Sequence, residues 1–133
     1  MKEVKDILKD TYTRFIHETK EELQNSKELL KVIDCIEYKT KKNGRPYTKT
    51  VDNIVNTCNC HLRYDRHYKW LDVHGADMTK MYLSHYVAVF DCRQSLDGLK
   101  KDISDYRKRL VKQIEENEHK LTMSFEEFTK GGF

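Results

Sequence analysis

Side chains that can bind a metal ion are concentrated in one short stretch of the chain. The sequence contains four cysteines and six histidines, and five of these ten lie within the 18 residues from Thr57 to His74, TCNCHLRYDRHYKWLDVH. Thiolate and imidazole groups are the ligands that zinc prefers, and four of them complete a closed tetrahedral site. The stretch therefore predicts a structural zinc site, for which the candidate ligands are Cys58, Cys60, His61 and His67.

The same stretch has a second interpretation, in which no metal is needed. The Cys-x-Cys-His spacing from Cys58 to His61 differs from the Cys-x-x-Cys spacing of common zinc fingers. Cysteine is also a frequent core residue. If the stretch is a β-strand, Cys58, Cys60, Leu62 and Tyr64 share one face, as in a strand that packs against a core. The zinc site and the core strand are therefore both kept as expectations.

Recognisable catalytic motifs are absent from the sequence. It contains no glycine-rich nucleotide-binding pattern, no G-x-S-x-G nucleophile motif and no H-E-x-x-H metal motif. Asp65, His67 and Asp72, near Lys69, offer an acid–base set of the kind that a small metal-dependent nuclease uses, but their spacing does not require one. We therefore expect a binding protein rather than an enzyme, with the nuclease as an alternative.

Cationic and aromatic residues are the features that favour binding. The basic segment KTKKNGR and the aromatic residues that follow it supply the candidate partner-binding residues, which are Lys39, Lys41, Lys42, Arg45, Tyr47, Tyr68 and Trp70. Tyrosine, tryptophan and arginine anchor many protein interfaces, and the same mixture suits single-stranded nucleic acid. The alternative is that the basic segment is a solvated turn and the rings fill a thin core.

The composition predicts one small cytoplasmic domain. The 133 residues carry a formal charge of only +3, which does not indicate a dedicated nucleic-acid-binding protein. No apolar run approaches the ~18 residues needed to span a membrane, and the N-terminus is too charged for a signal peptide. In a reducing cytoplasm the cysteines are expected to be thiols or metal ligands rather than disulfides.

The hydrophobic pattern predicts a mainly α-helical fold with a small β-ribbon. Apolar residues recur every three or four positions in two long segments, which predicts two long amphipathic helices, over 1–37 and from Leu96 to Leu121. Between them we expect a basic loop (39–45), a short helix (from Pro46 to about Asn59), a two-stranded ribbon (61–65 and 67–73) and a buried central helix (77–90). An aromatic tail, Phe125, Phe128 and Phe133, follows Ser124.

The segment GRPYTKTVDNIVNTC, with the later Trp70-Leu71-Asp72 and DMTKMYLSHY, resembles the region ahead of the helicase core in phage and plasmid primase-like replication proteins. The resemblance covers less than half of the chain, and the ATPase motifs of that family are absent. It implies a nucleic-acid-binding replication accessory protein, and no catalytic residue is carried over.

A second resemblance is one of size and composition. A small protein rich in Lys, Glu and Tyr and without catalytic motifs is similar to the anti-CRISPR proteins of type II-A that phages and mobile elements make. That resemblance implies a non-catalytic inhibitor that binds a host RNA-guided nuclease in the bacterial cytoplasm and blocks DNA loading or cleavage. We keep this as the expected function, with the structural zinc as its cofactor and the replication accessory protein as the first alternative.

Overall fold

The computed structural model describes residues 3–55, 57, 60–74 and 86–130, and only the backbone of 55, 61, 86 and 87. The chain is mainly helical with a small antiparallel sheet, as its hydrophobic pattern predicts. Its elements in order are α1 (Val4–Asn43), α2 (Lys49–Val55), β1 (His61–Asp65), β2 (Trp70–His74), β3 (Tyr86–Asp91), α3 (Leu96–Leu121) and α4 (Phe125–Lys130).

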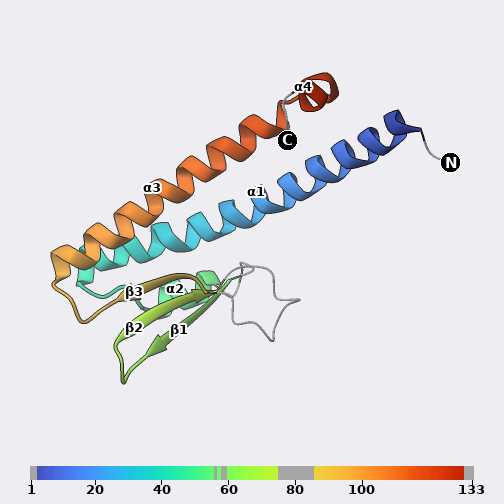
Figure 1. Ribbon diagram of the computed structural model, residues 1–133. Helices are drawn as coiled ribbons and strands as arrows, with labels where there is room; N and C mark the ends of the chain where they lie inside the picture. The colour runs from blue at the N-terminus through green and yellow to red at the C-terminus, as the bar shows by residue number, and fades with distance from the viewer. Residues whose placement is uncertain (1–2, 56, 58–59, 75–85, 131–133) are drawn as a thin grey trace.

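The two long helices, α1 and α3, lie antiparallel and form a helix pair that extends well beyond the rest of the fold (Figure 1). The sheet lies against only the half of this helix pair where α1 ends and α3 begins, and α2 lies behind the sheet (Figure 1). The side-chain oxygen of Ser95 caps α3 by accepting a hydrogen bond from the N–H of Gly98, 3.2 Å away. None of the described helices is both long enough and apolar enough to cross a membrane.

Helix α1 is longer than its sequence pattern predicts. Most of the segment expected to be a basic loop is the last turn of this helix, which ends at Asn43. Thr40 is fully buried there, and its hydroxyl donates a hydrogen bond to the carbonyl of Ile36. Gly44 ends the helix in the left-handed conformation, with φ of 71°, and its N–H donates to the carbonyl of Thr40. Lys41 and Lys42 lie in the last turn, where their positive charges are favourable to the helix dipole.

The sheet has three strands in the order β1-β2-β3, whereas the sequence predicts a ribbon of two. The predicted central helix is wrong over Tyr86–Phe90, which belongs to β3, while its earlier part lies outside the described residues. Ala88 and Phe90 are buried while Val89 is 52% exposed, which is the alternation of a strand. An apolar run of this length is compatible with either element, and pairing with β2 favours the strand.

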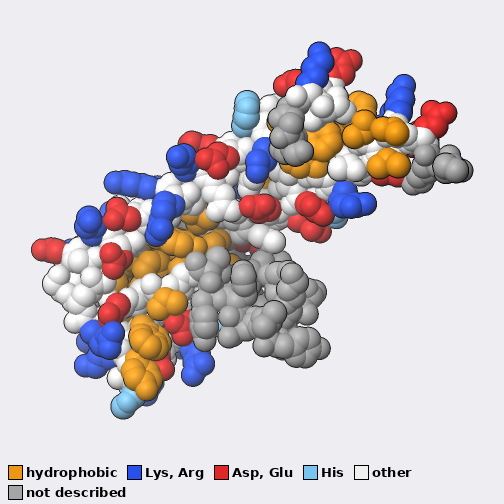
Figure 2. All heavy atoms as spheres, in the orientation of Figure 1, with side chains coloured by type: hydrophobic (Ala, Val, Ile, Leu, Met, Phe, Trp, Pro, Cys, Tyr) orange, Lys and Arg blue, Asp and Glu red, His pale blue; other side chains and the backbone are white. Residues whose placement is uncertain are grey.

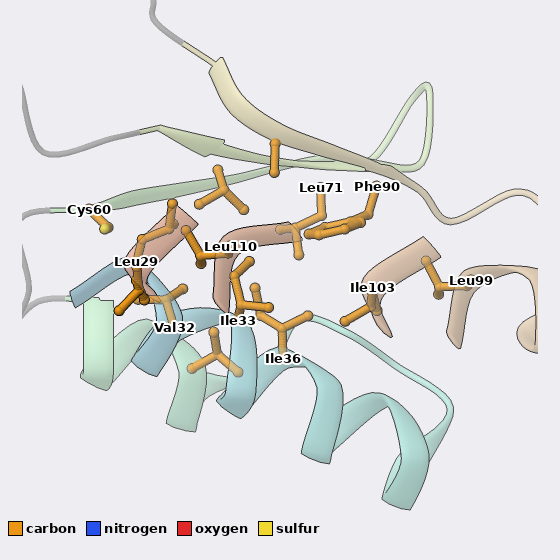
Figure 3. Packing of buried hydrophobic residues seen from close by; sticks show 14 of the residues in the cluster. Leu29, Val32, Ile33, Ile36, Cys60, Leu71, Phe90, Leu99, Ile103 and Leu110 are labelled. Atoms are coloured by element: carbon orange, nitrogen blue, oxygen red, sulfur yellow. The ribbon is translucent and has the colours of Figure 1, made fainter. Parts of the chain in front are cut away.

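The hydrophobic core lies between the sheet and the pair of long helices (Figure 3). Leu71 and Phe90 point from the sheet toward Ile33, Ile36 and Ile103 of the two long helices (Figure 3). Cys60 and Val51 belong to the same cluster of buried residues, so α2 and the start of β1 also pack on this core.

The end of the helix pair that lies away from the sheet has its own aromatic cluster. The rings of Phe125 and Phe128 on α4 lie 5.6 and 5.4 Å from that of Tyr12, and Phe128 also contacts Phe15. Ser124 accepts a hydrogen bond from the N–H of Glu127 and thus caps α4. The predicted apolar stripe of α1 extends further still, but its first residue, Val4, is 73% exposed.

Candidate functional site

The predicted zinc ligands do not all lie together. Cys58 is outside the described residues, and only the backbone of His61 is described. Cys60 directly precedes β1, whereas His67 lies in the loop beyond the other end of that strand. Five strand residues span about 16 Å, and zinc–ligand bonds are only about 2 Å long. The backbone therefore separates two of the predicted ligands, Cys60 and His67.

Cys60 is 4% exposed and packs in the hydrophobic core (Figure 3). Leu62 and Tyr64 lie on the same face of β1 and pack against that core, which agrees with the core-strand interpretation. Across the sheet, His61 pairs with His74, so the register places His74 rather than His67 beside the cysteine end of β1. In the part of the chain that the structure describes, no three His, Cys, Asp or Glu side chains are grouped closely enough to hold a metal ion.

The β1–β2 loop is a compact turn built around Asp65. One carboxylate oxygen of Asp65 accepts hydrogen bonds from the N–H groups of His67 and Tyr68, each 2.9 Å long. The N–H of Lys69 donates to the Asp65 carbonyl at 2.7 Å, and Lys69 adopts a left-handed φ of 56°. The N–H of Tyr68 is the main reason that the pKa of Asp65 lies below its ordinary value. Asp65 therefore has a structural role that orders the loop.

This turn presents a stacked aromatic pair at the end of the sheet. The rings of Tyr68 and Trp70 have centroids 5.0 Å apart and planes 17° apart, and the ring of His67 meets Tyr68 edge-on at 4.7 Å. The guanidinium of Arg93 lies over the indole of Trp70 at 5.7 Å. Figure 2 shows hydrophobic side chains at this end of the molecule with Lys and Arg side chains on both sides. We call Tyr68, Lys69, Trp70 and Arg93 the hairpin tip, after the β1–β2 hairpin at whose end they lie.

Arg93 is held in place by an acidic neighbour. Its Nε and Nη2 donate to the two carboxylate oxygens of Asp91, both at 3.0 Å, and these bonds lower the pKa of Asp91. Asp91 is the cross-strand partner of Trp70 in the sheet register. Strand β3 thus positions Arg93 against β2. The sequence prediction missed Arg93 because it placed the preceding segment in a helix.

A shallow groove of about 310 Å³ lies beside the hairpin tip on the face of the sheet away from the helices. Its described lining residues are Arg63, Asp65, Tyr68, Trp70, Asp72 and Val89. Arg63, Asp72 and Val89 are direct cross-strand neighbours. Asp72 is only 6% exposed, and this burial raises the pKa of its carboxyl group. The groove contains two of the three residues of the alternative nuclease set, Asp65 and Asp72, and one of them is committed to the turn.

The predicted lysines lie elsewhere, on the last turns of α1. The ammonium groups of Lys39 and Lys42 are 5.7 and 5.8 Å from the ring centre of Tyr38, which is 58% exposed. Lys41 forms an ion pair with Glu37 at 3.6 Å. The three lysines therefore form a surface of their own with Tyr38, a residue that the prediction left out.

Arg45 and Tyr47, the remaining predicted residues, line a separate cavity of about 520 Å³. Its described lining residues are Gly44, Arg45, Pro46, Tyr47, Tyr64, Arg66, Cys92 and Leu99. The rings of Tyr47 and Tyr64 stack with centroids 6.1 Å apart and planes 10° apart. The thiol of Cys92 donates a weak hydrogen bond to the carbonyl of Phe90, and burial raises its pKa, so it is a packed thiol.

No protein-family model, curated protein or solved structure matches this chain.

Proposed function

We propose that this protein is a non-catalytic inhibitor that binds a host protein, an RNA-guided nuclease of the kind that anti-CRISPR proteins block. The observation that supports binding is the hairpin tip, where a stacked tyrosine–tryptophan pair lies beside an arginine. Tyr68 is 48% exposed, although its ring is already ordered by Trp70. Aromatic and arginine side chains carry most of the binding energy in protein interfaces, and rings ordered in advance lose less entropy on binding.

The turn makes this surface rigid as well as exposed. Two backbone N–H groups are bonded to Asp65, and the N–H of Cys92 donates to the Lys69 carbonyl at 2.9 Å, which ties the loop to the residue after β3. The ion pair between Arg93 and Asp91 fixes the cation over the indole. This arrangement favours recognition over catalysis, because both carboxylates at the tip are engaged, Asp65 in the turn and Asp91 with Arg93.

The direct test is reconstitution with a type II-A RNA-guided nuclease and its guide RNA. One equivalent of the protein should form a stable complex and prevent target DNA from binding or being cleaved. In Tyr68→Ala the dissociation constant should rise by about 30-fold, the effect of losing an interface residue worth ~2 kcal/mol. Tyr38→Ala is the matched control, since Tyr38 is exposed but lies outside the hairpin tip. Unchanged binding by Tyr68→Ala, with its fold intact by circular dichroism, would refute the tip as the interface.

The alternative function is that of a nucleic-acid-binding replication accessory protein. The exposed stack and its neighbouring cations support it, because bases stack on aromatic rings and phosphates pair with cations. Binding to a single-stranded oligonucleotide should then weaken steeply between about 50 and 200 mM salt. Strong oligonucleotide binding without any affinity for the nuclease would favour this alternative over the inhibitor.

A structural zinc ion is a further part of the proposal. Its support is the cluster of soft ligands in the sequence, of which Cys58 and Cys60 are the proposed thiolate ligands, without His67.

A further inference from the structure

Two arginines share the cavity that lies between the α1–α2 connection, the end of β1 and the start of α3. Arg45 follows the helix-ending Gly44, and Arg66 follows the last residue of β1. Both line the same space of about 520 Å³, and the described residues around it include no carboxylate. The cavity therefore has an uncompensated positive charge.

Two of the other arginines have acidic partners. Arg93 is paired with Asp91, and Arg107 with Asp34. Neither Arg45 nor Arg66 forms an ion pair with any residue in the described ranges. A guanidinium group offers several N–H donors in a plane and binds phosphate more effectively than an ammonium group does. Two of them facing one cavity favour an anionic ligand with several oxygen atoms.

The same cavity provides an aromatic surface. Tyr64 packs against the core, and Tyr47 stacks on it with nearly parallel planes while remaining 37% exposed. The neighbouring Pro46 is buried, which restrains the backbone that carries both Arg45 and Tyr47. An ordered tyrosine beside two arginines is suited to a ligand that combines a planar ring with a phosphate.

We propose that this cavity binds a phosphorylated nucleoside, with the phosphate at Arg45 and Arg66 and the base against Tyr47. The ligand is either a free nucleotide or one nucleotide of a single strand, because both present the same ring and phosphate. This site is distinct from the hairpin tip: its described lining residues do not overlap with those of the groove beside Tyr68 and Trp70. The proposal therefore does not depend on the binding of a host protein.

Calorimetric titration of the full-length protein with AMP, adenosine and inorganic phosphate tests the combination of ring and anion. AMP should bind at least about tenfold more tightly than either half alone, since stacking and phosphate contacts each contribute. Equal affinity for AMP and phosphate would show that the base does not contribute to binding, and it would overturn the proposal. Absence of binding by AMP and by single-stranded oligonucleotides would overturn it as well.

The source of the nucleotide is distinguished by comparing AMP with short oligoadenylates that carry or lack a 5′-phosphate, so that the base is the same in every ligand. Tighter binding of AMP identifies a free nucleotide, and tighter binding of either oligonucleotide identifies a strand. Each outcome supports the shared chemistry.

Substitutions locate the site. Arg45→Gln, Arg66→Gln and Tyr47→Leu should each weaken AMP binding by about tenfold, the effect expected for one charge-assisted or stacking contact. Arg14→Gln is the matched control, because Arg14 is an exposed arginine on α1 outside both the cavity and the hairpin tip, and its AMP affinity should be unchanged. If Arg14→Gln reduces affinity as much as the cavity variants do, the binding is general electrostatic attraction and the site is refuted.

Discussion

The hydroxyl group of Tyr12 donates a hydrogen bond of 2.6 Å to the carbonyl of Met123, 111 residues later in the chain. Tyr12 lies on α1, and Met123 lies in the connection between α3 and α4. The bond therefore joins α1 to the end of α3, at the end of the helix pair that the sheet does not support (Figure 1). It also satisfies a backbone carbonyl in the connection between these two helices.

We expect Tyr12→Phe to lower the free energy of unfolding by about 1 kcal/mol, the usual net contribution of one such bond. The ring contacts with Phe125 and Phe128 are retained, so the change isolates the hydroxyl. Urea denaturation measures the difference, and Tyr38→Phe at an exposed position is the control that should change nothing. Equal stability of Tyr12→Phe and the wild type would mean that the hydroxyl contributes no net stability.

Asn117 interrupts the apolar face of α3. It is 2% exposed, and its side-chain nitrogen has no hydrogen-bond partner among the described residues. A buried amide left unsatisfied costs ~1–3 kcal/mol, so Asn117→Leu should stabilise the protein by at least ~1 kcal/mol. Lys112→Leu, at an exposed position of the same helix, should stay within ~0.5 kcal/mol of the wild type. A loss of stability in Asn117→Leu would show that the amide is satisfied in solution.

The pKa shifts of Asp72 and Asp65 predict opposite effects of pH on stability. Burial raises the folded-state pKa of Asp72 above its ordinary value of 3.8, so folding favours its protonated form. Its contribution to stability is then largest below that value and is lost as the pH rises through the raised pKa. Asp72→Asn should remove this loss and stabilise the protein at neutral pH, relative to the wild type.

Asp65 is the matched comparison. Hydrogen bonds from the loop lower its pKa below 3.8, so its contribution is present above that value and is lost as the pH falls through the lowered pKa. Asp65→Asn should therefore reduce stability at neutral pH and flatten the acid limb. Denaturation curves from pH 2 to 8 measure both variants, and changes of the same sign in the two would contradict the assignment.

The zinc proposal predicts about one equivalent of zinc in protein purified without added metal. A chelator should then lower the melting temperature, because the binding energy of a structural zinc site contributes to folding. Cys60→Ser should abolish the effect of the chelator, whereas Cys92→Ser should leave it intact. Since Cys60 also packs in the core, the decisive quantity is the response to the chelator and not the melting temperature itself. A melting temperature that the chelator does not change would exclude a structural zinc.

The sequence by itself determined the two long helices and most of their ends. Apolar spacing marks α1 and α3 and places the ends of α3 at Leu96 and Leu121, because such a pattern depends on near neighbours in the chain. The sequence predicts a basic loop over 39–45, whereas α1 continues to Asn43, because the burial of Thr40 holds this turn in the helix. The exposed lysines beside Thr40 carry no information about that burial.

The tertiary structure decided the parts that depend on pairing between distant segments. The run ending at Phe90 is compatible with helix and strand, and β2 selects the strand. That choice brings Arg93 over Trp70 and defines the hairpin tip. Likewise, His61 and His67 are only six positions apart in the chain. The register of the β1–β2 hairpin places His74 opposite His61, whereas His67 lies in the loop at the other end of β1. Spacing along a chain does not specify distance until the strands have paired.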